Sequence, residues 1–323
     1  MSPTSTSRRS SAGFLSSAKT FFLPVGQHID PDGVRGYPID MRVKAASAAG
    51  PPPEYWEPEA LYVATTQYAL GCHERWLHGD GEQWLQASLE AARRLISLQS
   101  PDGSWHHRRP LRHTFPLPPP WASGITQGQG ASLMVRLHLQ TGEPEFARAA
   151  GLALGPLTTP QARGGVRGEI GGLPWPEEYP TSPQSHVLNG AIFALFGFRD
   201  VAVGLGDAQA GRNFADGIES LASNLHRYDT GSWSLYSLFP HPILNRASSF
   251  YHDLHVNLLT AMRSLAPRPE FEATRERWAA YSASRYSRVT SFAWKAAFRV
   301  IVPRDPRAAR ALPWSHLRHA ADV

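Results

Sequence analysis

A proline-rich loop carries two adjacent acids and a phenol, which are groups able to move protons. The segment PWPEEYPTSPQSHVLNGA spans residues 174–191, and its prolines restrict the backbone that holds Glu177, Glu178 and Tyr179. Side chains on a stiff loop lose little freedom when they engage a ligand. The segment fits either a binding loop or the cap of the apolar helix that follows. Asn189 lies one turn into this helix. For Glu177 we favour the cap, and we expect Glu177→Gln to be nearly silent.

A second group of candidate residues lies in YDTGSWSLYSL and FYHDLHVNLL. The first segment contributes Tyr236. In the second, Tyr251 and His255 are four residues apart and share one helix face, beside His252. A histidine pair spaced by three residues is compatible with metal binding, but the sequence offers no obvious third ligand. We therefore predict no metal, and we interpret the histidines as core residues or as sugar contacts.

Two amides separated by one glycine form a third candidate site. In WASGITQGQGAS, Gln127 and Gln129 lie at the expected start of a helix. An amide both donates and accepts hydrogen bonds, so the pair suits sugar hydroxyls. The glycines equally fit a helix start that packs closely against a neighbour.

These segments are separated by apolar residues at helical spacing. The pattern predicts about eight helices, at 58–76, 81–99, 124–142, 144–154, 186–200, 213–225, 248–265 and 269–289. No run is a convincing strand, although Asp229-Thr230-Gly231 favours one small β-hairpin at 228–238. We predict an all-α protein, an α/α toroid or incomplete α/α barrel of helical hairpins whose long loops carry the site. An irregular helical bundle is the alternative.

Composition narrows the class of protein. The chain has 323 residues, 42% of them hydrophobic, a single cysteine (Cys72) and a formal net charge of +5. One cysteine excludes an intrachain disulfide and a cysteine metal cage, and the charge favours anionic partners. Residues 1–36 are expected to form a disordered tail, with a weak export signal as the alternative. We expect no membrane-spanning segment and no nucleic acid partner, and the cytoplasm fits best.

The motifs together resemble a known family. WASGITQGQGASLMVRLHLQTGE, EEYPTSPQSHVLNGAIFALFGFRD, YDTGSWSLY and YHDLHVNLL occur in this order and look like the C-terminal domain of the D-glucuronyl C5-epimerases of heparan sulfate and heparin biosynthesis. The resemblance covers roughly residues 37–290 and includes YPID and LQSPDGSW. It implies an α/α-barrel domain, dimers, and epimerisation of D-glucuronate to L-iduronate within a polysaccharide, without a nucleotide cofactor. We accordingly expect no cofactor and an anionic, heparosan-like glycan as substrate.

The resemblance also implies roles for particular residues. Glu178 matches the family's catalytic glutamate, and the matching tyrosines are Tyr179, Tyr236 and Tyr251. Loss of the C5 hydrogen leaves an enediolate-like anion, and inversion needs a base and an acid on opposite faces of the sugar ring. Substrate contacts are expected from Gln127, Gln129, Asn189, Arg246, His252 and His255.

One departure from the family pattern concerns the substrate carboxylate. The family has an Arg-His pair soon after the position of Tyr236, where this chain has Phe239 and Pro240. Cations or strong donors must face the charge that develops on the carboxylate. We expect His241 or Arg246 to replace the pair, or activity to be altered. Animal members also carry a membrane anchor and an N-terminal β-rich domain, which we expect this chain to lack.

Two other functions use the same features. A polysaccharide lyase begins with the same C5 deprotonation and ends in β-elimination. A non-catalytic glycan-binding toroid is favoured if the missing Arg-His pair is decisive.

The C-terminal part, residues 291–323, is expected to form a separate basic segment. Residues 285–319 carry eight Lys or Arg and one acid, with a helical part at 292–302. This segment fits a solvated tail whose apolar residues dock on the toroid. The sharper hypothesis is that it holds an anionic partner, either the glycan outside the cleft or a membrane surface.

Overall fold

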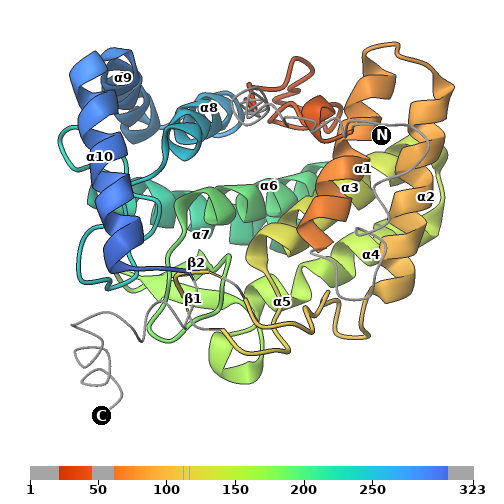
Figure 1. Cartoon of the computed structure of the whole chain (residues 1–323). Helices are drawn as coiled ribbons and strands as arrows, with labels where there is room; N and C mark the ends of the chain where they lie inside the picture. Colours follow the sequence, from red (N-terminus) through yellow and green to blue (C-terminus); the bar gives the residue numbers. More distant parts are fainter. Residues whose placement is uncertain (1–21, 46–61, 112, 116, 305–323) are drawn as a thin grey trace, which may run out of the picture.

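The computed structural model describes residues 22–45, 62–111, 113–115 and 117–304 (Figure 1). The α-helices are α1 (Tyr62–Leu77), α2 (Glu82–Leu98), α3 (Gly124–Thr141), α4 (Pro144–Ala153), α5 (Gly155–Thr158), α6 (Leu188–Leu205), α7 (Ala208–Asn224), α8 (Ser249–Leu265), α9 (Pro269–Ala283) and α10 (Arg285–Ile301). Short 3₁₀ turns are η1 (Arg42–Lys44), η3 (Gln161–Arg163) and η4 (Leu225–Tyr228). One antiparallel hairpin pairs β1 (Arg167–Ile170) with β2 (Leu173–Pro176).

Consecutive helices pack as hairpins around a central pair. α1 packs on α2, α3 on α4, α6 on α7, and α8 on α9, while α3 and α6 form the largest contact between these units. Figure 1 shows α3 and α6 crossing the middle, with α1 and α2 on one side and α8, α9 and α10 on the other. The expected α/α toroid, incomplete and built from helical hairpins, is confirmed.

The crossing of α3 and α6 depends on glycine. A β-carbon on Gly128 would lie 2.4 Å from the Ala194 Cα, and one on Gly197 would lie 2.6 Å from the Gly128 Cα. The helix backbones therefore touch, which only small residues allow. This contact fixes α3 against α6, and the candidate site is built beside the first turns of both helices.

Residues 22–36 are ordered against the core, which corrects part of the expected tail. The Arg199 guanidinium donates to the carbonyl oxygens of Asp30, Pro31 and Gly33 at 2.9, 2.6 and 3.1 Å. A buried ion pair between Arg136 and Asp200, 2.6 Å long, lies beside it. The backbone of residues 30–33 thus provides hydrogen-bond acceptors for the buried Arg199 guanidinium. Local composition does not reveal this contact. Residues 1–21 lie outside the described residues.

The small β-hairpin forms at a different place from the one expected. At 228–238 the structure has two isolated bridges, one between Asp229 and Ser234 around a tight turn and one from Leu235 to Arg246. The ladder is at 167–176, where prolines 174 and 176 occupy a strand of a two-stranded sheet. Both strands of such a sheet are edge strands, which tolerate proline.

The expected helix at 269–289 is two helices. It breaks at Ser284, whose hydroxyl accepts a hydrogen bond from the Ser287 backbone and caps α10. α10 therefore starts before residue 291 and crosses the expected boundary of the basic segment. The rest of that segment, 305–323, lies outside the described residues, and its contact with a membrane stays a prediction.

α6 is long and apolar enough to cross a membrane by length and composition. Of that helix, 78% is buried inside the fold, and buried core helices commonly pass this test.

Candidate functional site

The structure brings together the carboxyl and the three phenols that the sequence analysis singled out. The side chains of Glu178 and Tyr179, of Tyr179 and Tyr236, and of Tyr236 and Tyr251 lie close enough to shift one another's pKa values. The rings of Tyr236 and Tyr251 lie edge to face, with centroids 4.8 Å apart. Asn189 donates from Nδ2 to the Glu178 Oε2 at 3.2 Å. These residues, called the Glu178 cluster below, form one continuous line of proton-bearing groups.

The start of α6 and the start of α3 hold Glu178 in place. A β-carbon on Gly190 would lie 2.5 Å from the Glu178 Oε2, so only glycine lets the carboxyl pack on this turn. The Ser123 hydroxyl donates to the Glu178 carbonyl at 2.9 Å. Gly124 donates its backbone N–H to the Glu177 carbonyl at 3.0 Å, and a β-carbon there would collide with that carbonyl. The glycines beside Gln127 and at the start of α6 therefore serve close approach.

Glu177 anchors the loop that carries Glu178. Its fully buried carboxylate accepts hydrogen bonds at 2.8 Å from the Ser185 hydroxyl and the His186 backbone, and its other oxygen lies 2.7 Å from the His186 Nδ1. His186 has a φ of 45°, which is uncommon for a residue with a β-carbon. The Tyr228 hydroxyl donates to the His186 carbonyl at 2.8 Å. Glu177 is therefore a buried clamp rather than a peripheral cap, and its substitution is not expected to be silent.

Backbone hydrogen bonds place the other two phenols. Leu188 at the start of α6 donates to the Tyr236 carbonyl at 3.3 Å, and Tyr236 donates to the Asn245 carbonyl at 2.8 Å. Ser248 caps α8, with its hydroxyl accepting from the Tyr251 backbone at 3.4 Å. Tyr251 thus projects from the first turn of a capped helix, where its position is well defined.

Burial sets the protonation states of the cluster. It raises the pKa of Glu178 to about 7, against the opposing effect of the hydrogen bonds from Tyr179 and Asn189. Burial also raises the pKa of Tyr251, to about 12, while Arg304 and Arg299 oppose the rise. The pKa values of Tyr179 and Tyr236 rise well above 10, with burial the largest cause and the Glu178 charge next. Near neutral pH the cluster therefore holds one carboxyl poised to titrate and three neutral phenols.

Comparison with known sequences decides which family this site belongs to. A sequence model described as the D-glucuronyl C5-epimerase C-terminus matches residues 99–280, more than half of the chain. The chain belongs to the D-glucuronyl C5-epimerase family. The matched region contains all four members of the line from Glu178 to Tyr251.

Individual relatives agree on the family. The chain is 32% identical over 220 residues to a D-glucuronyl C5-epimerase of Caenorhabditis elegans, covering 62% of this chain and 36% of the relative. It is 27% identical over 139 residues to the uncharacterized protein MJ1128 of Methanocaldococcus jannaschii, covering 42% of this chain and 44% of that protein. The chain thus matches less than half the length of each of these curated relatives.

A solved structure shows a more distant likeness. It is that of an unsaturated glucuronyl hydrolase from Bacillus sp. GL1, described as responsible for glycosaminoglycan degradation. Identity is 19%, the TM-score is 0.44, and the match covers 71% of this chain and 61% of the hydrolase.

Aromatic residues from another loop lie against the epimerase-family tyrosines. The His113 ring stacks near Tyr179 and Tyr236, with centroids at 5.4 and 5.8 Å. Phe115 lies 5.6 Å from Tyr179 and 5.1 Å from Phe239. His113 and Phe115 are not among the site residues predicted from the sequence. The only signal was the aromatic and proline composition of 113–121, which does not say where the loop folds.

The amides of α3 do not join the Glu178 cluster. Gln127 is buried, and its side chain accepts from the Trp105 backbone and donates to the Gly103 and Ala153 carbonyls at 2.9 to 3.1 Å. Both N–H donors and the carbonyl oxygen of Gln127 are therefore engaged within the core. Gln129 is also buried and accepts from Gln67 at 3.2 Å. Both fit the close-packing interpretation.

The histidines of α8 point into the core. Both His252 and His255 place Nδ1 on the Ser234 hydroxyl, at 2.7 and 2.9 Å, and both are buried. His252 also stacks on Trp233 at 3.7 Å and contacts the Trp278 carbonyl through Nε2. Burial lowers the pKa of His252 to about 4, so it is neutral at pH 7. This geometry fits the core-residue interpretation of both histidines.

Arg246 does not face the cluster either. Its guanidinium lies 5.0 Å from the Trp294 ring and bonds the Ser291 hydroxyl at 3.4 Å, both on α10. The residue therefore ties the Tyr236 loop to the last helix.

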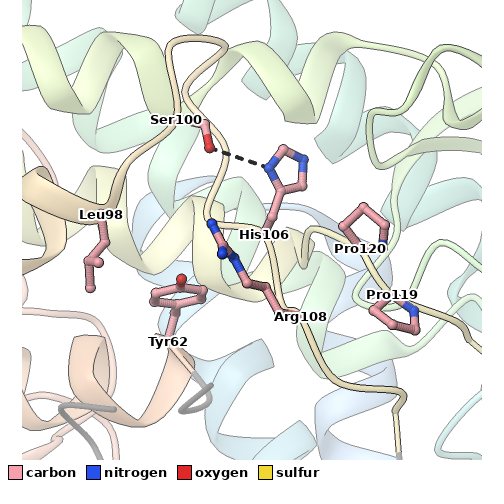
Figure 2. Close-up of a pocket in the computed structure, with 7 residues that line it drawn as sticks. All are labelled: Tyr62, Leu98, Ser100, His106, Arg108, Pro119 and Pro120. Carbon is pink, nitrogen blue, oxygen red and sulfur yellow. Dashed lines mark hydrogen bonds between the residues drawn. The ribbon is translucent and has the colours of Figure 1, made fainter. Parts of the chain in front are cut away.

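A hollow of about 500 Å³, shown in Figure 2, has no member of the cluster among its lining residues. Its lining residues are Tyr62, Leu98, Ser100, His106, Arg108, Pro119 and Pro120. The ring of Tyr62, in its lining, lies 5.2 Å from that of His107. His107 stacks on Trp121 at 4.1 Å, and Trp121 lies 6.0 Å from Tyr179. The hollow and the cluster are thus separated by this stacked pair.

The clamp made by Glu177 generates a testable prediction. Glu177→Gln keeps the shape but replaces a charged acceptor of buried hydrogen bonds, so the free energy of unfolding should fall by about 2 kcal/mol. Urea denaturation followed by circular dichroism measures this change. Glu169→Gln, which changes an exposed acid of β1 in the same way, should be neutral. An unchanged midpoint for Glu177→Gln would contradict the clamp.

Proposed function

We propose that this chain is a polysaccharide uronate C5-epimerase that converts D-glucuronate to L-iduronate residues in a heparosan-like glycan. The observation that carries the proposal is the Glu178 cluster, in which neighbouring phenols lead from a buried carboxyl to a second proton-transfer group. Epimerisation at C5 needs such a pair, because a residue within a polymer cannot turn over between removal and return of the proton.

Glu178 suits the first step, removal of the C5 hydrogen. A base works best when its pKa lies near the working pH, and burial brings the pKa of Glu178 to about 7. The carboxylate takes the proton, and the C5–H electron pair moves toward the substrate carboxylate to form an enediolate-like anion. The apolar surroundings that raise the pKa also keep water from quenching this anion.

Tyr251 suits the second step, protonation of C5 from the other side. It lies at the far end of the line from Glu178 and is a neutral phenol near pH 7. Arg299 and Arg304 act on Tyr251 and favour its phenolate, which would lower the cost of giving up its proton. The anion's electron pair returns to form the new C5–H bond, leaving phenolate on Tyr251 and a protonated Glu178.

The two inner phenols suit the return of the enzyme to its starting state. Each turnover moves one proton from Tyr251 to Glu178 by way of the substrate. The phenols of Tyr179 and Tyr236 lie between these groups, which gives a proton a path back along the line. A sugar ring entering the cluster would replace the His113 ring in its contacts with Tyr179 and Tyr236.

Replacement of the proposed base tests the first step. Glu178→Gln should lower deuterium incorporation at C5 of heparosan in D2O by about 10²-fold or more, because the amide cannot accept the proton. NMR measures the incorporation, and Glu169→Gln is the matched acid control. Wild-type protein that yields an ultraviolet-absorbing unsaturated uronate would show a lyase instead. Near-normal exchange by folded Glu178→Gln would remove the residue from the mechanism.

Replacement of the second group separates exchange from inversion. Tyr251→Phe keeps the ring but has no proton to give, so conversion to L-iduronate should fall by about 10²-fold. Glu178 can still remove and return a proton on one face, so deuterium should continue to enter D-glucuronate. Both products are resolved in one NMR time course. Equal loss of exchange and inversion would argue against separate groups for the two faces.

The raised pKa of Glu178 predicts the pH profile. The base is the carboxylate, so the rate at saturating substrate should fall about tenfold per pH unit below about pH 7. It should level above that value, because the tyrosines stay protonated well beyond pH 8. Initial rates of C5 deuterium incorporation between pH 5 and 9 provide the measurement. A profile flat down to about pH 5 would mean that Glu178 titrates normally.

A further inference from the structure

α10 brings three cations to the Tyr251 end of the cluster. Lys295 and Arg299 lie one turn apart on this helix, and Arg304 follows its end. The Lys295 Nζ is 5.7 Å from the centroid of the Tyr236 ring. Arg299 acts electrostatically on Tyr236 and Tyr251, and Arg304 acts on Tyr251. Figure 1 shows α10 running down one side of the molecule toward the loops beneath α8.

Specific contacts hold α10 in this position. The Trp294 indole donates to the Leu244 carbonyl at 2.8 Å, and Lys295 donates to the Asn245 Oδ1 and the Arg246 carbonyl, each at 2.8 Å. With the stacking of Arg246 on Trp294, these bonds join α10 to the loop between Tyr236 and α8. The helix is thus docked on the loop that carries an active-site tyrosine.

The cations have no acid among them. Within the described residues, none of Lys295, Arg299 and Arg304 forms an ion pair with a carboxylate. The buried Arg299 Nη1 has no hydrogen-bond partner there. Lys295 has three N–H donors and uses two of them. Like charges held together with unused donors indicate a place for an anion.

We propose that Arg299, with Lys295 and Arg304, binds the carboxylate of the uronate residue whose C5 is epimerised. The inference rests on the proposed function and names the part of it that the family motifs leave empty. Loss of the C5 proton moves charge onto this carboxylate, so fixed cations stabilise the anion more than the ground state. A guanidinium also matches a carboxylate with two parallel hydrogen bonds, which fixes the sugar ring.

This assignment accounts for the missing Arg-His pair. Phe239 at that position packs on Phe115, so the local sequence provides an apolar wall there. His252 and His255 are committed to Ser234, and Arg246 is committed to α10. The family match ends at residue 280, before α10 begins. The cations therefore come from a helix that lies outside the family match.

Crowding of the charges supports the same assignment. Burial, then repulsion from Arg299 and Arg304, lowers the pKa of Lys295 to about 7. Burial and the same neighbours lower the pKa of His113 to about 3, so this histidine adds no charge at pH 7. A bound carboxylate would relieve the repulsion among the three cations.

Binding measurements with two matched saccharides test the inference. One is a heparosan oligosaccharide, and the other is the same oligosaccharide with its carboxyl groups reduced to alcohols. Arg299→Met keeps the stem that packs near Phe298 and removes the charge. By calorimetry, it should weaken binding of the acidic oligosaccharide about tenfold or more, in line with one lost charge-assisted pair. Binding of the reduced oligosaccharide should not change.

Two further variants complete the comparison. Arg285→Met removes the same charge from an exposed site about 21 Å away along α10 and should leave both affinities unchanged. Arg299→Lys should recover part of the acidic binding. Unchanged acidic binding by Arg299→Met, or equal loss with both saccharides, overturns the inference. Wild-type protein that binds the acidic saccharide through Arg299 but exchanges no C5 deuterium overturns the proposed function instead.

Discussion

The site depends on one constraint, a carboxyl group that is buried without a cation beside it. The groups that act on the Glu178 carboxyl are two hydrogen-bond donors and the neighbouring Glu177, and burial outweighs the donors. A direct ion pair with arginine would return the pKa of Glu178 toward its ordinary value, where the carboxyl would no longer suit the proposed role of a base near pH 7. Gly190 and the phenols are what a buried, unpaired carboxyl requires, namely close packing and neutral donors.

The two adjacent acids show how environment decides the role of a residue. Glu177 and Glu178 share a loop and a chemistry, yet one accepts hydrogen bonds from Ser185 and His186 while the other faces phenols. The first holds the unusual backbone of His186, and so fixes the loop from which the second acts. Their alternation on the chain sends neighbouring side chains to opposite sides of the loop.

Helical spacing predicts most of the fold, because an amphipathic helix reports its own buried face. The family motifs predict the four proton-bearing groups, and the structure places these together. What local pattern misses is contact between distant segments. His113 contacts Tyr236, which is more than a hundred residues later in the chain. Lys295 contacts Asn245, which is about fifty residues earlier. The break at Ser284 escapes notice because a serine cap lies within an otherwise continuous helical pattern. Gln127 and His252 were expected to contact the substrate, but their side chains form hydrogen bonds within the core instead.

The two ends of the line have neighbours of opposite charge. These charges reduce the difference between the pKa values of Glu178 and Tyr251. The carboxyl end is near another acid and the phenol end is near Arg299 and Arg304. The first arrangement raises the pKa of the base, and the second limits the rise at Tyr251, so both bring the two groups closer in proton affinity. A proton can then move in either direction with less cost than between an ordinary carboxyl and an ordinary phenol. If the cations were instead at the Glu178 end, both pKa values would move apart. The position of α10 is therefore tied to the position of Glu178, although more than a hundred residues separate them in the chain.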